Sequence, residues 1–326
     1  MEIFKLTVNQ MLVIFILILI GYLLRHKNIV EYNASANLSK MELFIFSPAL
    51  NFVTQAKNCT AGNLKENWVL ILYGGLTILV AVVIAEFLSR LFVRDYRENR
   101  EAAYKRCIYK YSIAFANYGF FGNFIVLSVF GEEMLFKYQM FTFMLSFFVY
   151  SWGMYTLIPK DRNTGITKHI IKGLTSPPML AMVGGMLVGL LGWGQAITEV
   201  PFINTVLTNA GDCMGPIAML LAGMALGNYD IKEMFRDKKI YIVSALRLIV
   251  LPAAFVLVHK LIGTTNPVII PLTLIAFAGP LGMNTIVFPA AYGGDTKTGA
   301  SMTLISSLFS VITLPLMYYL FVVLLG

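Results

Sequence analysis

Apolar residues along this chain gather into ten segments of about 20 residues, and the short stretches between them hold most of the charged residues. An α-helix of about 20 residues crosses the roughly 30 Å hydrocarbon core of a bilayer. The pattern therefore predicts an all-α integral membrane protein with about ten transmembrane helices. The predicted spans cover residues 6–24, 35–56, 67–92, 108–130 and 134–158, followed by 177–195, 203–226, 239–262, 267–291 and 299–325.

Composition supports this class. Of the 326 residues, 58% are hydrophobic and 13% are charged, and the mean hydropathy is +0.74. Soluble domains carry about 25% charged residues. The net charge of +8 does not indicate nucleic-acid binding, because the basic residues lie in short loops, where membrane topology explains them. We expect the lipid bilayer as a partner and no nucleic acid.

Lysine and arginine are divided unevenly between the loops. If alternate loops face the cytoplasm, 17 of these residues lie in cytoplasmic loops and four in external loops. Cytoplasmic loops of membrane proteins carry such an excess of basic residues. The bias predicts a multi-pass protein of the cell (plasma) membrane with both termini outside.

Two stretches of the chain resemble each other. Residues 113–123 read IAFANYGFFGN, and residues 275–284 read IAFAGPLGMN. Met11, Gly21 and Pro48 also match residues 168 positions later. We therefore predict two five-helix repeats, residues 1–158 and 177–326, joined by a cytoplasmic linker over residues 159–176. Because each repeat has an odd number of spans, the second enters the membrane upside down, which gives a 5+5 inverted repeat.

Both related stretches interrupt an apolar span with Gly, Asn or Pro. Broken helices at matching places in two halves of a carrier point to its substrate site. The free amides and the positive dipole at the start of a half-helix suit a carboxylate, and asparagine side chains add neutral donors. The alternative is that these residues only allow kinks and close helix packing.

Several short motifs follow one another in a characteristic order. They are IGYLL (20–24), LSK (38–40), SPAL (47–50), NYGFFG (117–122), PIAML (216–220) with Gly223 and Leu226, RL (247–248) with Pro252, GP (279–280) with Asn284, and LPL (314–316). In this order they resemble the auxin efflux carrier family, which includes bacterial malate and malonate permeases and plant auxin exporters. Asn123 departs from the family, whose members often have proline there. The long cytoplasmic loop of some plant members is absent, so the plant-type substrate does not follow.

The resemblance covers essentially the whole chain and implies that the fourth and ninth spans unwind and cross near the bilayer midplane. It further implies a secondary carrier for a small organic-acid anion, with malate among the family's substrates, that works by alternating access around the crossed helices. The residues expected to bind the substrate are Asn117, Tyr118, Gly119, Gly122, Asn123, Gly279, Pro280, Gly282, Asn284 and Thr285.

Charged residues within the spans are further candidates. Asp212 lies near the middle of a predicted span, where an ionisable group is costly and commonly functional. We expect it either to carry a coupling proton or cation, or to form a structural ion pair with Arg247. Lys40 is a candidate for attracting the substrate. Alternatively, Lys40 and Glu42 reach from the end of the second span to water.

Other classes of function find little support. No motif of a zinc protease, a serine hydrolase or a phosphate-binding loop is present, so we predict neither an enzyme nor a cofactor or metal site. Two alternatives stay open: a sodium-coupled carrier of the bile-acid symporter type, and a membrane sensor that keeps this fold without transporting. The sequence also leaves open which acid is transported and in which direction. It leaves open whether a proton or sodium is the coupling ion, and whether the protein forms a homodimer.

Overall fold

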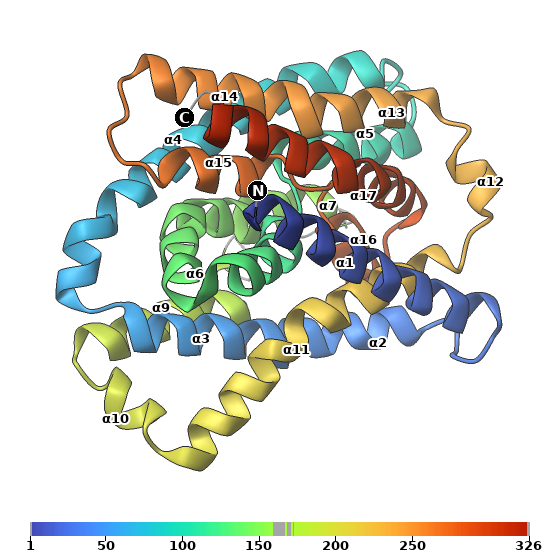
Figure 1. The fold of residues 1–326 in the computed structure, drawn as a ribbon. Helices are drawn as coiled ribbons and strands as arrows, with labels where there is room; N and C mark the ends of the chain where they lie inside the picture. Colours follow the sequence, from blue (N-terminus) through green and yellow to red (C-terminus); the bar gives the residue numbers. More distant parts are fainter. Residues whose placement is uncertain (1, 159–166, 168–170, 172, 325–326) are drawn as a thin grey trace.

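The computed structural model describes residues 2–158, 167, 171 and 173–324 (Figure 1). Every regular element within these residues is a helix, and the only β-type pairing among them is one isolated antiparallel bridge between Ala116 and Leu281. The predicted all-α fold is therefore confirmed for this part of the chain. Most of the predicted linker, residues 159–176, lies outside the described residues.

The first half has helices at each of its five predicted spans. Gly131, with φ at +83°, interrupts α6 and separates the fourth predicted span from the fifth. The elements are α1 (Glu2–His26), α2 (Ala34–Met41), η1 (Glu42–Phe46), α3 (Ser47–Asn58), α4 (Ala61–Phe92), α5 (Arg100–Ala114), η2 (Tyr118–Gly122), α6 (Asn123–Phe148), η3 (Val149–Gly153) and α7 (Met154–Leu157).

The second half also has helices at its five predicted spans, with short helices in two of its connections. The elements are α9 (Pro177–Leu190), α10 (Gly194–Thr198), α11 (Pro201–Leu226), α12 (Ile231–Met234), α13 (Lys238–Ala245), η4 (Leu246–Val250), α14 (Leu251–Leu261), α15 (Ile269–Phe277), α16 (Asn284–Tyr292), α17 (Lys297–Tyr318) and η5 (Tyr319–Leu324).

Two spans contain a π-helical turn just before a proline. In the second span, the Ser47 N–H donates to the Glu42 carbonyl five residues earlier, and Pro48 follows. In the eighth span, η4 precedes Pro252 in the same way. Because proline has no N–H to donate, the wider turn accommodates it without ending the helix. Each turn also rotates the side chains around it relative to a regular α-helix.

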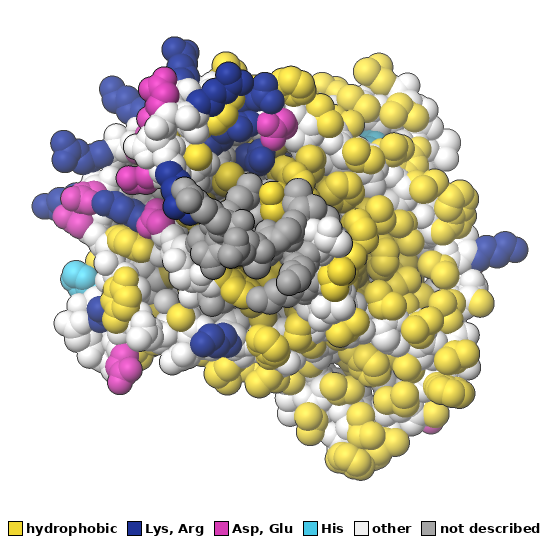
Figure 2. All heavy atoms as spheres, turned by 180° about the vertical axis from the view of Figure 1, so that it is seen from behind, with side chains coloured by type: hydrophobic (Ala, Val, Ile, Leu, Met, Phe, Trp, Pro, Cys, Tyr) yellow, Lys and Arg dark blue, Asp and Glu magenta, His cyan; other side chains and the backbone are white. Residues whose placement is uncertain are grey.

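Within the described residues, five helical stretches are long and apolar enough to cross a membrane: residues 8–26, 61–92, 118–157, 238–261 and 297–324. Large hydrophobic side chains are exposed along several of them, including α1, α4 and α14. Figure 2 shows hydrophobic side chains over much of one face, with charged side chains gathered toward one end. This distribution fits a multi-pass membrane protein.

Helices of the two halves pack reciprocally. The helix α1 lies along α11, and α9 lies along α3, so the first predicted span contacts the seventh and the sixth predicted span contacts the second. In each half the third span also packs against its own fourth and fifth spans. In Figure 1, α2, α3, α9 and α11 lie along the lower side, and α4, α5, α13 and α14 lie along the upper side. The molecule therefore contains two groups of helices.

Glycines allow this close packing between the halves. A Cβ atom on Gly223 would lie 2.0 Å from the Ile18 carbonyl oxygen, and one on Gly21 would lie 2.1 Å from that of Leu220. On α9, a Cβ atom on Gly185 would lie 2.6 Å from the Phe52 carbonyl oxygen. The Gly-x-x-x-Gly pattern at residues 185–189 therefore packs within the bundle.

The predicted orientation can be tested by cysteine labelling. On a background without the native cysteines, we expect Glu98→Cys, in the exposed loop after α4, to react with a membrane-impermeant maleimide only after the cells are permeabilised. We expect Ala196→Cys, exposed on α10, to react in intact cells. The opposite pattern would overturn the assignment from loop charge.

Candidate functional site

The two predicted helix breaks are present and lie against each other. The helix α5 ends at Ala114 and α15 ends at Phe277, and the next regular elements begin at Tyr118 and Asn284. Ala116 and Leu281 form the antiparallel bridge, and the Asn117 N–H donates to the Pro280 carbonyl at 2.8 Å. Each unwound segment thus supplies backbone partners to the other, as non-helical backbone inside a membrane protein requires.

The local sequence explains both breaks. Pro280 lacks an N–H group, and Gly279 before it has a low helix propensity. In the first break, the Asn117 side-chain oxygen accepts a hydrogen bond from the Phe121 N–H at 3.4 Å and caps the turn that follows. The Leu281 N–H donates to the Ser306 hydroxyl at 2.9 Å, which anchors the second break to α17.

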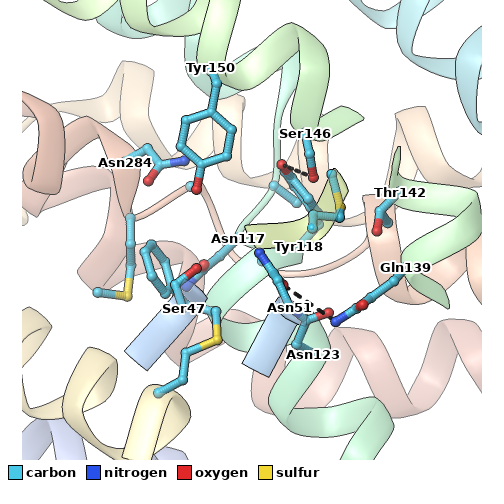
Figure 3. Close-up of a pocket in the computed structure, with 17 residues that line it drawn as sticks. Ser47, Asn51, Asn117, Tyr118, Asn123, Gln139, Thr142, Ser146, Tyr150 and Asn284 are labelled. Carbon is cyan, nitrogen blue, oxygen red and sulfur yellow. Dashed lines mark hydrogen bonds between the residues drawn. The ribbon is translucent and has the colours of Figure 1, made fainter. Parts of the chain in front are cut away.

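A polar compartment lies beside the breaks. Side chains from α3, α6, η3, α9 and α11 complete its wall, and Figure 3 shows several of them converging on one space. None of the lining residues carries a formal charge. They are Ser47, Asn51, Ala116, Asn117, Tyr118, Gly119, Phe120, Asn123, Gln139, Thr142, Ser146, Tyr150, Met182, Met214, Gly282, Met283 and Asn284.

Six of the ten residues predicted to bind substrate line this compartment: Asn117, Tyr118, Gly119, Asn123, Gly282 and Asn284. The other four do not line it.

Those four residues support the breaks. A Cβ atom on Gly122 would lie 2.0 Å from the Tyr138 hydroxyl, and one on Gly279 would lie 3.4 Å from the Phe121 ring. Pro280 accepts the hydrogen bond from the Asn117 N–H. Thr285 is buried and donates to the Gly282 carbonyl at 2.8 Å. These contacts place all four in the packing around the compartment.

The three asparagines of the compartment differ in how they are used. Asn284 donates through its amide to the Tyr111 hydroxyl at 2.8 Å. The Asn117 and Asn123 amide nitrogens make no hydrogen bond to any residue that the structure describes, although both residues are at least 94% buried. Two amide donors are therefore available to a ligand at the compartment.

Sequence reasoning missed the opposite wall. Gln139 on α6 links two side chains of the second span: its carbonyl accepts from the Gln55 amide at 2.9 Å, and its amide donates to Asn51 at 3.4 Å. Ser47 on α3 and Tyr150 on η3 also line the compartment. Isolated amides within apolar spans were the available signal.

The charged candidates lie away from this compartment. Asp212 is exposed and lines a separate hollow with Lys57, and Lys40 is exposed on α2. Arg247 is 0% exposed and lies with its guanidinium 5.2 Å from the centre of the Phe277 ring.

Two interpretations of charged residues are therefore wrong. No nitrogen of the Arg247 guanidinium has a hydrogen-bond partner among the described residues, so the predicted ion pair with Asp212 is not formed. Glu42 does not reach water, because its residue is 0% exposed. Both residues lie in π-helical turns, where side-chain directions differ from those of a regular helical projection.

Apolar spans and two opposed helix breaks around a polar compartment define a membrane transporter. The sequence profile described as "Membrane transport protein" matches residues 6–318, and the chain belongs to this auxin-efflux-carrier-like family. The resemblance seen in the motifs is thereby confirmed. A similar protein is an uncharacterized transporter of Methanocaldococcus jannaschii, with 26% identity over 314 residues, 94% of this chain and 96% of that protein.

Proposed function

We propose that this transporter is a secondary carrier that moves a small organic-acid anion across the plasma membrane through the compartment at the two helix breaks. The observation that carries the proposal is the pair of unused amide donors on the buried residues Asn117 and Asn123, in a lining without acidic side chains. Hydrogen bonds from neutral donors stabilise an anion, and a carboxylate needs such donors once it leaves water.

The surrounding electrostatics favour an anion as well. The helices that restart after the breaks begin at Tyr118 and Asn284, both at the compartment, and helix starts carry partial positive charge. Arg247 adds a buried positive charge behind the breaks, where its guanidinium lies against the ring of Phe277. Neutral donors in direct contact would hold the anion while allowing its release.

The position of the compartment supports alternating access. One side of its wall comes from α3, α9 and α11, and the other side comes from the broken helices with α6 and η3. The helices α3, α9 and α11 belong to the lower group described in the fold, and α5, which leads into the first break, belongs to the upper group. A rocking motion of one group against the other would open the compartment to either side of the membrane.

The reciprocal packing of α1 with α11 and of α9 with α3 supports a 5+5 inverted repeat. In this proposal the repeats are residues 1–158 and 177–326, the fourth and ninth spans cross at the breaks, and residues 159–176 connect the repeats in the cytoplasm. An odd number of spans in each repeat is what inverts the second one.

Transport can be measured with purified protein in liposomes. We expect uptake of at least one member of a panel of small mono- and dicarboxylates, including malate and malonate, and no uptake in protein-free liposomes. Each anion is tested with and without sodium and with and without a pH gradient. An absolute requirement for sodium would favour the sodium-coupled alternative, and binding of an anion without flux would identify a sensor.

A further inference from the structure

Glu42 is an acidic residue buried without a partner. The residue is 0% exposed, and neither oxygen of its carboxyl group has a hydrogen-bond partner among the described residues. An ionised carboxylate without a partner in an apolar site is very unfavourable, whereas a carboxylic acid is much less so. An ionisable group buried at membrane depth is also a candidate functional site.

The π-helical turn connects Glu42 with the compartment. Within η1 the Ser47 N–H donates to the Glu42 carbonyl, so Ser47 lies one turn above Glu42 along the helix. Ser47 lines the compartment, as does Tyr150. Glu42 therefore lies one helical turn from a residue of the wall that would face the anion.

No basic side chain balances Glu42 from the elements packed against η1, which are α2, α3, α9 and α11. The helix α9 has no ionisable side chain. Elsewhere the charged or titratable groups are Lys40 on α2, which is exposed; Lys57 on α3, at its far end; and Asp212 and Cys213 on α11, both exposed. The neighbouring phenols are those of Tyr150 and Tyr292. Tyr150 belongs to η3, and Tyr292 belongs to α16, which packs on α2.

We propose that Glu42 is a proton-binding site that couples a proton to the anion. The carboxylate takes up one proton from water to become a carboxylic acid, which removes one negative charge beside the compartment. The anion then binds more tightly, and by reciprocity the bound anion makes the proton bind more tightly. The two ions leave together when the site opens on the other side. The coupling half of this proposal rests on the proposed function, while the proton site itself does not.

The proton site can be tested without a substrate, by infrared difference spectroscopy of the protein in lipid over a pH titration. We expect the wild type to show the carbonyl stretch of a protonated carboxylic acid near neutral pH, and Glu42→Gln to lose it. Asp212→Asn is the matched control, because Asp212 is an exposed carboxylate in a neighbouring span, and it should keep the band.

The wild-type spectrum decides the question even if a variant is unstable: absence of a protonated carboxyl band would overturn the proposal. The same band in Glu42→Gln would also overturn it. Glu42→Gln should keep the thermal stability of the wild type, because glutamine resembles the neutral acid in shape. Loss of folding in this variant would count against a neutral Glu42.

Coupling is tested by measuring the affinity for the transported anion of the panel as a function of pH. In the wild type and in Asp212→Asn, affinity should fall by about tenfold per pH unit where the unliganded Glu42 loses its proton. In Glu42→Gln it should be independent of pH. Equal pH dependence in all three proteins would overturn coupling. Failure to transport any anion would contradict the proposed function and leave the infrared result standing.

Discussion

We expect Asn117→Ala to weaken anion binding about ten- to a hundredfold, because a hydrogen bond to a charged group contributes about 1.5–3 kcal/mol. Asn117 is a buried residue that lines the compartment, and its amide nitrogen has no hydrogen-bond partner among the described residues. The substitution removes this donor and also the side-chain oxygen that accepts from the Phe121 N–H, so thermal stability is measured together with affinity. The measurement is isothermal titration of the purified protein with the anion that the liposome assay identifies.

Comparison variants separate a direct contact from a structural effect. Asn123→Ala should cause a loss of similar size, since its amide is equally unused. Asn33→Ala, at an exposed position without a capping hydrogen bond, should bind the anion as the wild type does. If neither Asn117→Ala, Asn123→Ala nor the double variant lost affinity, the anion would not be held at the breaks.

Asn284 gives a different expectation. Its amide already donates to Tyr111, which lies in the packing behind the breaks. Asn284→Ala removes this bond and leaves the buried Tyr111 hydroxyl without its donor, so it should lower thermal stability as well as affinity. A fall in affinity at unchanged stability would indicate that Asn284 contacts the anion directly.

The sequence was sufficient to predict where the helices and the breaks lie. Hydropathy depends on residues that are close in the chain, and the breaks have local causes, such as Pro280 and the cap made by Asn117. The repeat then indicated that the two breaks belong together, and the bridge between Ala116 and Leu281 shows that they do. Six of the ten residues expected at the breaks line the compartment.

The other wall of the compartment could not be predicted, because it depends on how distant helices are rotated. Asn51 and Gln139 are separated by 88 positions, and nothing local indicates that their amides meet. Glu42 illustrates the same limit. Its place near the end of a span indicated a solvated side chain, but a π-helical turn and the packing of α9 and α11 bury it.

Two neighbouring glycines on α9 provide the sharpest test of the packing between the halves. A Cβ atom on Gly185 would lie 2.6 Å from the Phe52 carbonyl oxygen and 3.1 Å from its Cα, and neither backbone atom can move alone. A Cβ atom on Gly184 would meet nothing within 4 Å. We therefore expect opposite effects from the same substitution one residue apart.

Gly185→Ala should destabilise the protein by about 1–3 kcal/mol, the usual cost of overpacking, because α9 has to move away from α3. Gly184→Ala should be neutral or stabilise it by up to about 1 kcal/mol, since alanine is the better helix former. Thermal unfolding in detergent measures both. Equal stability of the two variants would show that α9 does not approach α3 this closely.

Loss of dimers in Gly185→Ala without loss of monomer stability would instead assign this glycine to a contact between subunits. The close approach to Phe52 predicts the reverse: a destabilised monomer, with its oligomeric state unchanged.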